Sequence, residues 1–203
     1  MSRICLSILV TLGLGGGCAP AADQATPDEP LPDGVSGYAP AAVGGIPSVV
    51  SLQAPFVEVI PSEETPVIDQ FGLMFSPRRL VVRVGQAVRF TNSESLAHNV
   101  HLRFIASDST VLNVDTDPGG AVEFSLDQPG GYDVLCDTHP GMSAFIYATM
   151  SPYTVIAEND GQFLIQGVPP GTYDLTIWSV DPNLAIERSV ELGPGSTQLD
   201  LSR

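Results

Sequence analysis

Residues 131–142 read GYDVLCDTHPGM, and this segment carries the strongest signal in the chain. Tyr132, Val134 and Cys136 recur at every second position, and this period predicts a short β-strand over 132–136. The Pro-Gly pair that follows favours a tight loop. Strand end and loop together carry a thiol at Cys136, an imidazole at His139 and a thioether at Met142. Soft sulfur and imidazole donors in this combination are typical of a copper site.

A second imidazole is needed to complete such a site, and the segment FTNSESLAHNV at 90–100 offers one. His98 has the same parity as the apolar positions 100, 102 and 104, so we expect its side chain to point into the protein. His101 has the opposite parity, and we expect it to be exposed and outside the site. The three histidines of the chain therefore allow one mononuclear centre.

Three other interpretations of these residues are weaker. Zinc also binds Cys and His, but a thioether such as that of Met142 is a poor zinc ligand. A cysteine nucleophile with a histidine base is a second alternative, yet Cys136 and His139 around one tight loop converge more naturally on a metal. Each residue taken singly is also a common core residue. All of them would then have to occur at metal spacing by accident.

At these residues the chain resembles the cupredoxins, the small blue copper proteins of plastocyanin and amicyanin type. The resemblance rests on the C-x2-H-P-x-M loop and on the F-x-N-x5-H-N-V segment before it. It implies a copper domain over residues 67–149. Such a domain is all-β, a cupredoxin-like Greek-key β-sandwich with one type 1 copper ion under one end.

The same resemblance assigns roles to individual side chains. It implies that His98, Cys136 and His139 form a trigonal plane of copper ligands and that Met142 is the weak axial ligand. Asn99 would join the two ligand loops by a hydrogen bond. The implied activity is one-electron transfer and not catalysis, with a redox protein such as a c-type cytochrome or a dehydrogenase as partner.

Residues 150–203 form a second block of short strands, punctuated by DGQF at 160–163 and VPPG at 168–171. These turns resemble the carboxypeptidase regulatory-like family, which implies a small prealbumin-like β-sandwich. The block is short for that family, so we expect strands from 46–60 to complete it, with the copper domain inserted between the halves. Because that family is mostly structural or adhesive, the alternative function is a non-redox copper-binding or structural module at the cell surface.

The composition of the 203 residues narrows the classes of partner. Acidic side chains number 23 against 8 basic ones, which gives a formal net charge of −15. This charge repels a polyanion and excludes nucleic acid as a partner. The 20 Gly and 18 Pro favour a turn-rich β-protein over a helical bundle.

The N-terminus predicts export. Residues 1–21 have the layout of a signal peptide or of a lipoprotein signal, in which Cys18 would carry a lipid anchor. Residues 22–45 are rich in Ala, Pro, Asp and Gly, which predicts a flexible tether. We expect a periplasmic or cell-surface protein, either free or anchored as a lipoprotein, whose mature fold keeps Cys136 as its one thiol.

Overall fold

A computed structural model describes residues 34–54 and 63–201. The predicted signal, the start of the predicted tether and the end of the 46–60 segment lie outside these residues. The described part consists of strands and two 3-10 turns, Ile105–Ser107 and Pro182–Leu184, so the all-β expectation is confirmed. No helix in the described ranges is both long and apolar enough to cross a membrane.

The first sandwich is built from two sheets, with strand orders β5-β11-β10-β7-β8 and β4-β3-β6-β9. Apolar side chains of both sheets meet between them, and Phe75, Phe90 and Leu102 are among the fully buried ones. The strands are β3 (Val67–Gln70), β4 (Phe75–Ser76), β5 (Arg79–Arg83), β6 (Ala87–Asn92), β7 (His98–Phe104), β8 (Ser109–Thr116), β9 (Ala121–Ser125), β10 (Gly130–Leu135) and β11 (Ser143–Thr149).

Strands β7 and β10 bring the two ligand-bearing segments to one end of this sandwich. They pair antiparallel, with Leu102 opposite Val134 and His101 opposite Leu135. In an antiparallel pair the first residue of one strand lies beside the end of the other. His98 at the start of β7 and Cys136 directly after β10 are therefore neighbours.

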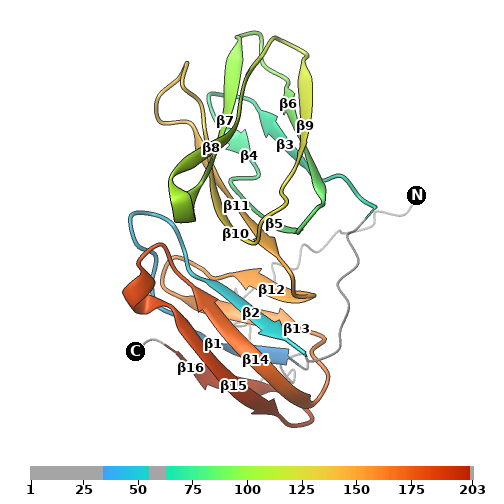
Figure 1. The fold of residues 1–203 in the computed structure, drawn as a ribbon, viewed down its shortest axis with the longest axis vertical. Coiled ribbons are helices and arrows are strands. Elements are labelled where there is room, and N and C mark those ends of the chain that lie inside the picture. Colours follow the sequence, from blue (N-terminus) through green and yellow to red (C-terminus); the bar gives the residue numbers. More distant parts are fainter. Residues whose placement is uncertain (1–33, 55–62, 202–203) are drawn as a thin grey trace, which may run out of the picture. The chain divides into compact units, whose positions relative to one another are not determined.

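The second sandwich combines strands from both ends of the described chain, as Figure 1 shows by the blue β1 and cyan β2 among orange and red strands. Its sheets have the orders β12-β2-β14-β15 and β13-β1-β16. Strand β2 pairs with β12 and β14 and not with the first sandwich. The strands are β1 (Gly34–Tyr38), β2 (Val49–Gln53), β12 (Tyr153–Ile156), β13 (Gln162–Gln166), β14 (Gly171–Trp178), β15 (Ile186–Leu192) and β16 (Thr197–Asp200).

Strand β1 corrects the expectation of a flexible tether that extends to residue 45. Residues 34–38 pair with β13 on one side and with β16 on the other. The small residues of GVSGY give this strand no clear hydrophobic pattern in the sequence. One of them, Gly37, is nevertheless required by the packing. A Cβ at Gly37 would lie 1.7 Å from the carbonyl oxygen of Leu199. The glycine therefore permits the close approach of β1 to β16.

Candidate metal centre

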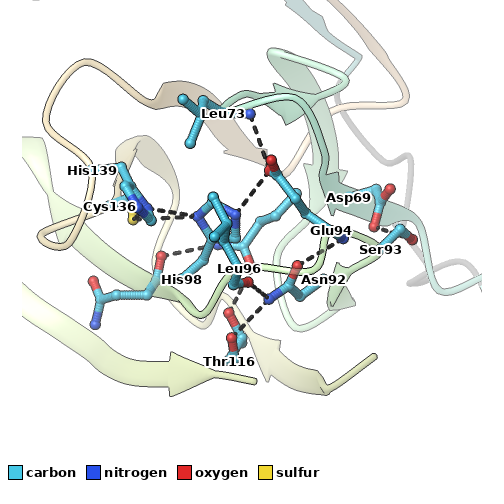
Figure 2. A network of polar contacts seen from close by, with 12 residues as sticks. Asp69, Leu73, Asn92, Ser93, Glu94, Leu96, His98, Thr116, Cys136 and His139 are labelled. Carbon is cyan, nitrogen blue, oxygen red and sulfur yellow. Dashed lines mark hydrogen bonds and ion pairs between the residues drawn. The ribbon is translucent and has the colours of Figure 1, made fainter. Parts of the chain in front are cut away.

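Three donor atoms converge at the end of the sandwich where β7 begins and β10 ends. The Nδ1 atoms of His98 and His139 lie 3.0 Å apart. The Sγ atom of Cys136 lies 4.0 Å from Nδ1 of His98 and 3.9 Å from Nδ1 of His139. Within the described ranges this is the one group of three or more His, Cys, Asp or Glu side chains with atoms close enough to share an ion. Figure 2 shows the His139 and Cys136 side chains on the same side of the His98 ring.

The environment of these atoms suits a soft metal ion. His98 and Cys136 are 1% and 4% exposed. The thiol and the two ring nitrogens lie within 4.8 Å of one another, and this donor set matches the preference of copper for sulfur and imidazole. The donor chemistry therefore fits a bound copper ion.

The loop after β10 holds itself closed through its backbone. The N–H of Met142 donates to the carbonyl of His139 over 3.2 Å, and the N–H of Cys136 donates to the carbonyl of Met142 over 3.3 Å. Met142 is 4% exposed and belongs to the same core cluster as Cys136. The loop thus brings the three residues of the C-x2-H-x2-M pattern to one side of the sandwich.

A carboxylate lies on the other side of the His98 ring. Oε2 of Glu94 is 3.0 Å from Nε2 of His98 and accepts a 3.1 Å hydrogen bond from the backbone N–H of Leu73. The Leu73 hydrogen bond is the main cause of a lowered pKa of Glu94, to which His98 also contributes. Figure 2 shows Glu94 between Leu73 and the imidazole. Glu94 was not predicted as a site residue, because a loop acid four residues before a histidine has no distinctive pattern in the sequence.

Asn92 shapes the loop that carries Glu94. Its Nδ2 donates to the carbonyls of Leu96 and Thr116, each over 2.8 Å. Its Oδ1 accepts a 3.0 Å bond from the N–H of Glu94. One buried amide therefore fixes the turn that ends at His98.

Asn99 and His101 follow His98 on β7 and contact the opposite ligand loop. Oδ1 of Asn99 accepts a 3.2 Å hydrogen bond from the N–H of Asp137. The imidazole of His101 contacts the Asp137 carboxylate over 2.9 Å and is only 19% exposed. His101 is therefore half-buried and not exposed as expected, although it lies outside the group of converging donor atoms. Parity placed it on the outer face of β7, but a carboxylate from the neighbouring loop covers it there.

The family of copper-binding proteins that includes plastocyanin and azurin matches residues 64–149. Plastocyanin of Ulva arasakii is 30% identical over 83 residues, which cover 36% of this chain and 82% of that protein. The chain belongs to the plastocyanin/azurin family.

Other proteins are similar to about half of this chain. Amicyanin-alpha of Methylorubrum extorquens is 28% identical over 109 residues, which are 50% of this chain and 88% of that protein. Among solved structures, a reduced amicyanin mutant is 22% identical with a TM-score of 0.39, covering 51% of this chain and 99% of its own. A purple cupredoxin from Nitrosopumilus maritimus is 22% identical with a TM-score of 0.37, covering 41% and 99%.

The cupredoxin resemblance of the sequence is thereby confirmed for the first sandwich. The family binds copper, and this chain has a candidate copper site formed by His98, Cys136 and His139. The family match ends at residue 149, so the kinship of residues 150–203 stays a prediction.

Proposed function

We propose that this protein binds one copper ion through His98, Cys136, His139 and Met142 and carries single electrons. The proposal rests on the convergence of one thiol and two imidazole nitrogens where β7 begins and β10 ends. Bound copper supplies a centre that alternates between the +1 and +2 states. The sandwich and the backbone hydrogen bonds of the ligand loop hold the protein residues in their positions.

We place the docking surface for a redox partner at this same end of the sandwich. His139 is partly exposed, whereas His98 and Cys136 are buried, so an electron reaches the centre by the shortest path at His139. Leu73 and Leu96 stand beside the site in Figure 2 and are 48% and 46% exposed. Exposed apolar side chains around a partly open imidazole suit a brief, weakly polar contact.

The charge of the chain favours a basic partner. A net charge of −15 attracts a cationic surface at long range, and a c-type cytochrome with basic residues around its haem is the kind of partner we propose. A dehydrogenase that reduces the copper would be the donor. Stopped-flow oxidation of the reduced protein by such a cytochrome should be fast and should slow as salt is added. Very slow exchange at every salt concentration would instead support the non-redox alternative.

Copper-loaded mature protein tests the ligand set. We expect an intense visible band and a narrow copper hyperfine splitting in the EPR spectrum. Cys136→Ser should abolish the band, and Met142→Gln should shift it. Met150→Gln is the matched control, because Met150 is 55% exposed and lies after β11. A wild-type protein without the band, or a Cys136→Ser variant that keeps it, would refute the proposal.

For the rest of the chain we propose an inserted arrangement. A carboxypeptidase regulatory-like sandwich, prealbumin-like in fold, comprises residues 150–203 and the strands β1 and β2. The DGQF turn leading into β13, the VPPG turn before β14, and the pairing of β2 with β12 and β14 support it. Residues 67–149 form the copper domain. Export through residues 1–21, to the periplasm or cell surface, belongs to the same proposal, with Cys18 lipidated or removed.

A further inference from the structure

Asp137, the residue directly after Cys136, is held from two directions. Its N–H donates to Oδ1 of Asn99 over 3.2 Å. Its carboxylate contacts Nδ1 of His101 over 2.9 Å and accepts a 3.1 Å bond from Nδ2 of Asn113. Backbone and side chain of this one residue are thus both tied to the β7–β8 pair.

These contacts close a ring of hydrogen bonds. Asn113 donates to the Asp137 carboxylate, Asn99 donates over 2.7 Å to Oδ1 of Asn113, and Asp137 donates from its backbone to Asn99. Asn99 is covalently next to His98, and Asp137 is covalently next to Cys136. The ring therefore joins the two backbones that carry the buried donor atoms, without using either donor atom.

His101 fastens the ring from the outside. Its Nε2 lies 2.7 Å from the hydroxyl of Thr110 on β8. Its Nδ1 faces the Asp137 carboxylate, and a carboxylate in its ordinary ionised form only accepts hydrogen bonds. Nδ1 of His101 is then the donor to Asp137. Both ring nitrogens have partners, which fixes the orientation of the imidazole.

We propose that Asp137 and His101 are positioning residues for the copper centre. They hold the start of the ligand loop against β7, so that Cys136 and His98 keep their spacing whether or not a metal is bound. The ring consists only of bonds between protein residues, whereas its consequence for copper rests on the proposed function. Removing one member leaves the others with unmatched polar groups, so the effect should spread around the ring.

Hydrogen exchange in the metal-free protein tests directly whether Asp137 and His101 act as a brace that holds the ligand loop against β7. Asp137→Ala keeps the backbone N–H at position 137, and we expect its exchange to be about tenfold faster once the carboxylate anchor is lost. His101→Ala should accelerate the same N–H by a similar factor, and the double variant should add little more. Asp108→Ala is the matched control, because it removes another exposed acid that pairs with a β7 side chain, Arg103.

Copper binding provides the second readout. Asp137→Ala and His101→Ala should weaken copper affinity about ten- to a hundredfold and shift the visible band, as loss of residues that orient ligands generally does. Asp137→Asn keeps an acceptor oxygen and should restore part of the affinity. Unchanged folded content by circular dichroism, compared with Asp108→Ala, separates this effect from unfolding.

The two proposals fail in different ways. A wild-type protein that exchanges slowly at position 137 but shows no blue band would refute the copper function and leave the brace standing. A blue wild type whose Asp137→Ala and His101→Ala variants match Asp108→Ala in exchange, affinity and spectrum would overturn the brace.

Discussion

At the scale of the residue, His98 has two different faces. Its Nδ1 points to Cys136 and His139, whereas its Nε2 meets the carboxylate of Glu94 at 3.0 Å. An ionised carboxylate only accepts hydrogen bonds, so Nε2 carries the proton. Nδ1 is then unprotonated, and its lone pair is available to a metal ion. The Glu94 contact therefore selects the tautomer that a metal at Nδ1 requires.

Glu94→Gln should raise the reduction potential of the copper-loaded protein. A negative charge beside the ligand stabilises the +2 state more than the +1 state, and the amide removes that charge while it keeps an acceptor oxygen. A tenfold change in relative stability corresponds to a rise of about 59 mV for one electron. Voltammetry measures the potential. Glu123→Gln, which removes an exposed carboxylate paired with Arg89, is the control and should leave the potential unchanged. Equal potentials in both variants would contradict the assigned role.

At the scale of the element, β11 serves both sandwiches. Ala144, Ile146 and Ala148 face the core of the first sandwich. On the opposite face the rings of Phe145 and Tyr147 each lie 5.5 Å, centroid to centroid, from that of Trp178 at the end of β14. This continuous apolar strand therefore has buried residues on both faces, in contrast to the alternation of an ordinary surface strand.

Gly131 on β10 has no room for a side chain beneath this aromatic group. A Cβ there would lie 2.7 Å from two ring atoms of Trp178 and 2.9 Å from the ring of Phe145. We expect Gly131→Ala to lower the free energy of unfolding by about 1–3 kcal/mol in urea titrations, because the rings must shift. Gly193→Ala is the control, since a Cβ there meets no atom within 4 Å.

A second variant separates overpacking from any effect on the strand itself. Adding Trp178→Leu to Gly131→Ala should recover part of the loss, because the smaller side chain frees the space. If Gly131→Ala and Gly193→Ala proved equally stable, the close packing at Gly131 would be wrong. The visible spectrum of the copper-loaded protein should stay unchanged, because Gly131 lies near the start of β10 whereas Cys136 follows its end.

At the scale of the whole molecule, the described residues belong to one compact unit. Each sandwich has its own core, and a third cluster around Val49, Phe145 and Tyr147 contains residues of both. Polar bonds add to this contact, such as the 2.8 Å hydrogen bond between the hydroxyls of Thr149 on β11 and Thr154 on β12. Unfolding of the two sandwiches should therefore be coupled.

Tyr147 makes that coupling sensitive to alkaline pH. Burial raises its pKa from 10.0 to about 12. The folded state holds the phenolic proton more tightly than the unfolded state, so its contribution to stability is complete below pH 10 and is lost as the pH rises towards 12. At about 1.4 kcal/mol per pKa unit, the loss approaches roughly 2–3 kcal/mol.

Urea titrations between pH 9 and 12 check this expectation. Tyr147→Phe has no proton to lose, so its free energy of unfolding should fall less steeply with pH than that of the wild type. Tyr38→Phe is the control, because Tyr38 is 45% exposed, and it should follow the wild-type slope. Parallel slopes for wild type and Tyr147→Phe would show that Tyr147 is not buried in solution.

The sequence by itself determined what is local in this protein. Side chains alternate with period two in β7 and β10, and the spacing within C-x2-H-x2-M is short. Parity and loop length therefore suffice to place His98, Cys136 and His139 at one end of the sandwich. Only the tertiary structure decided which distant segments meet. The Gly-rich β1 finds β13 and β16 more than a hundred residues later, and Glu94, His101 and Asp137 find partners that no spacing encodes. The physical reason is that periodicity is a property of neighbouring residues, whereas strand register and side-chain pairing depend on the packing of the whole sandwich.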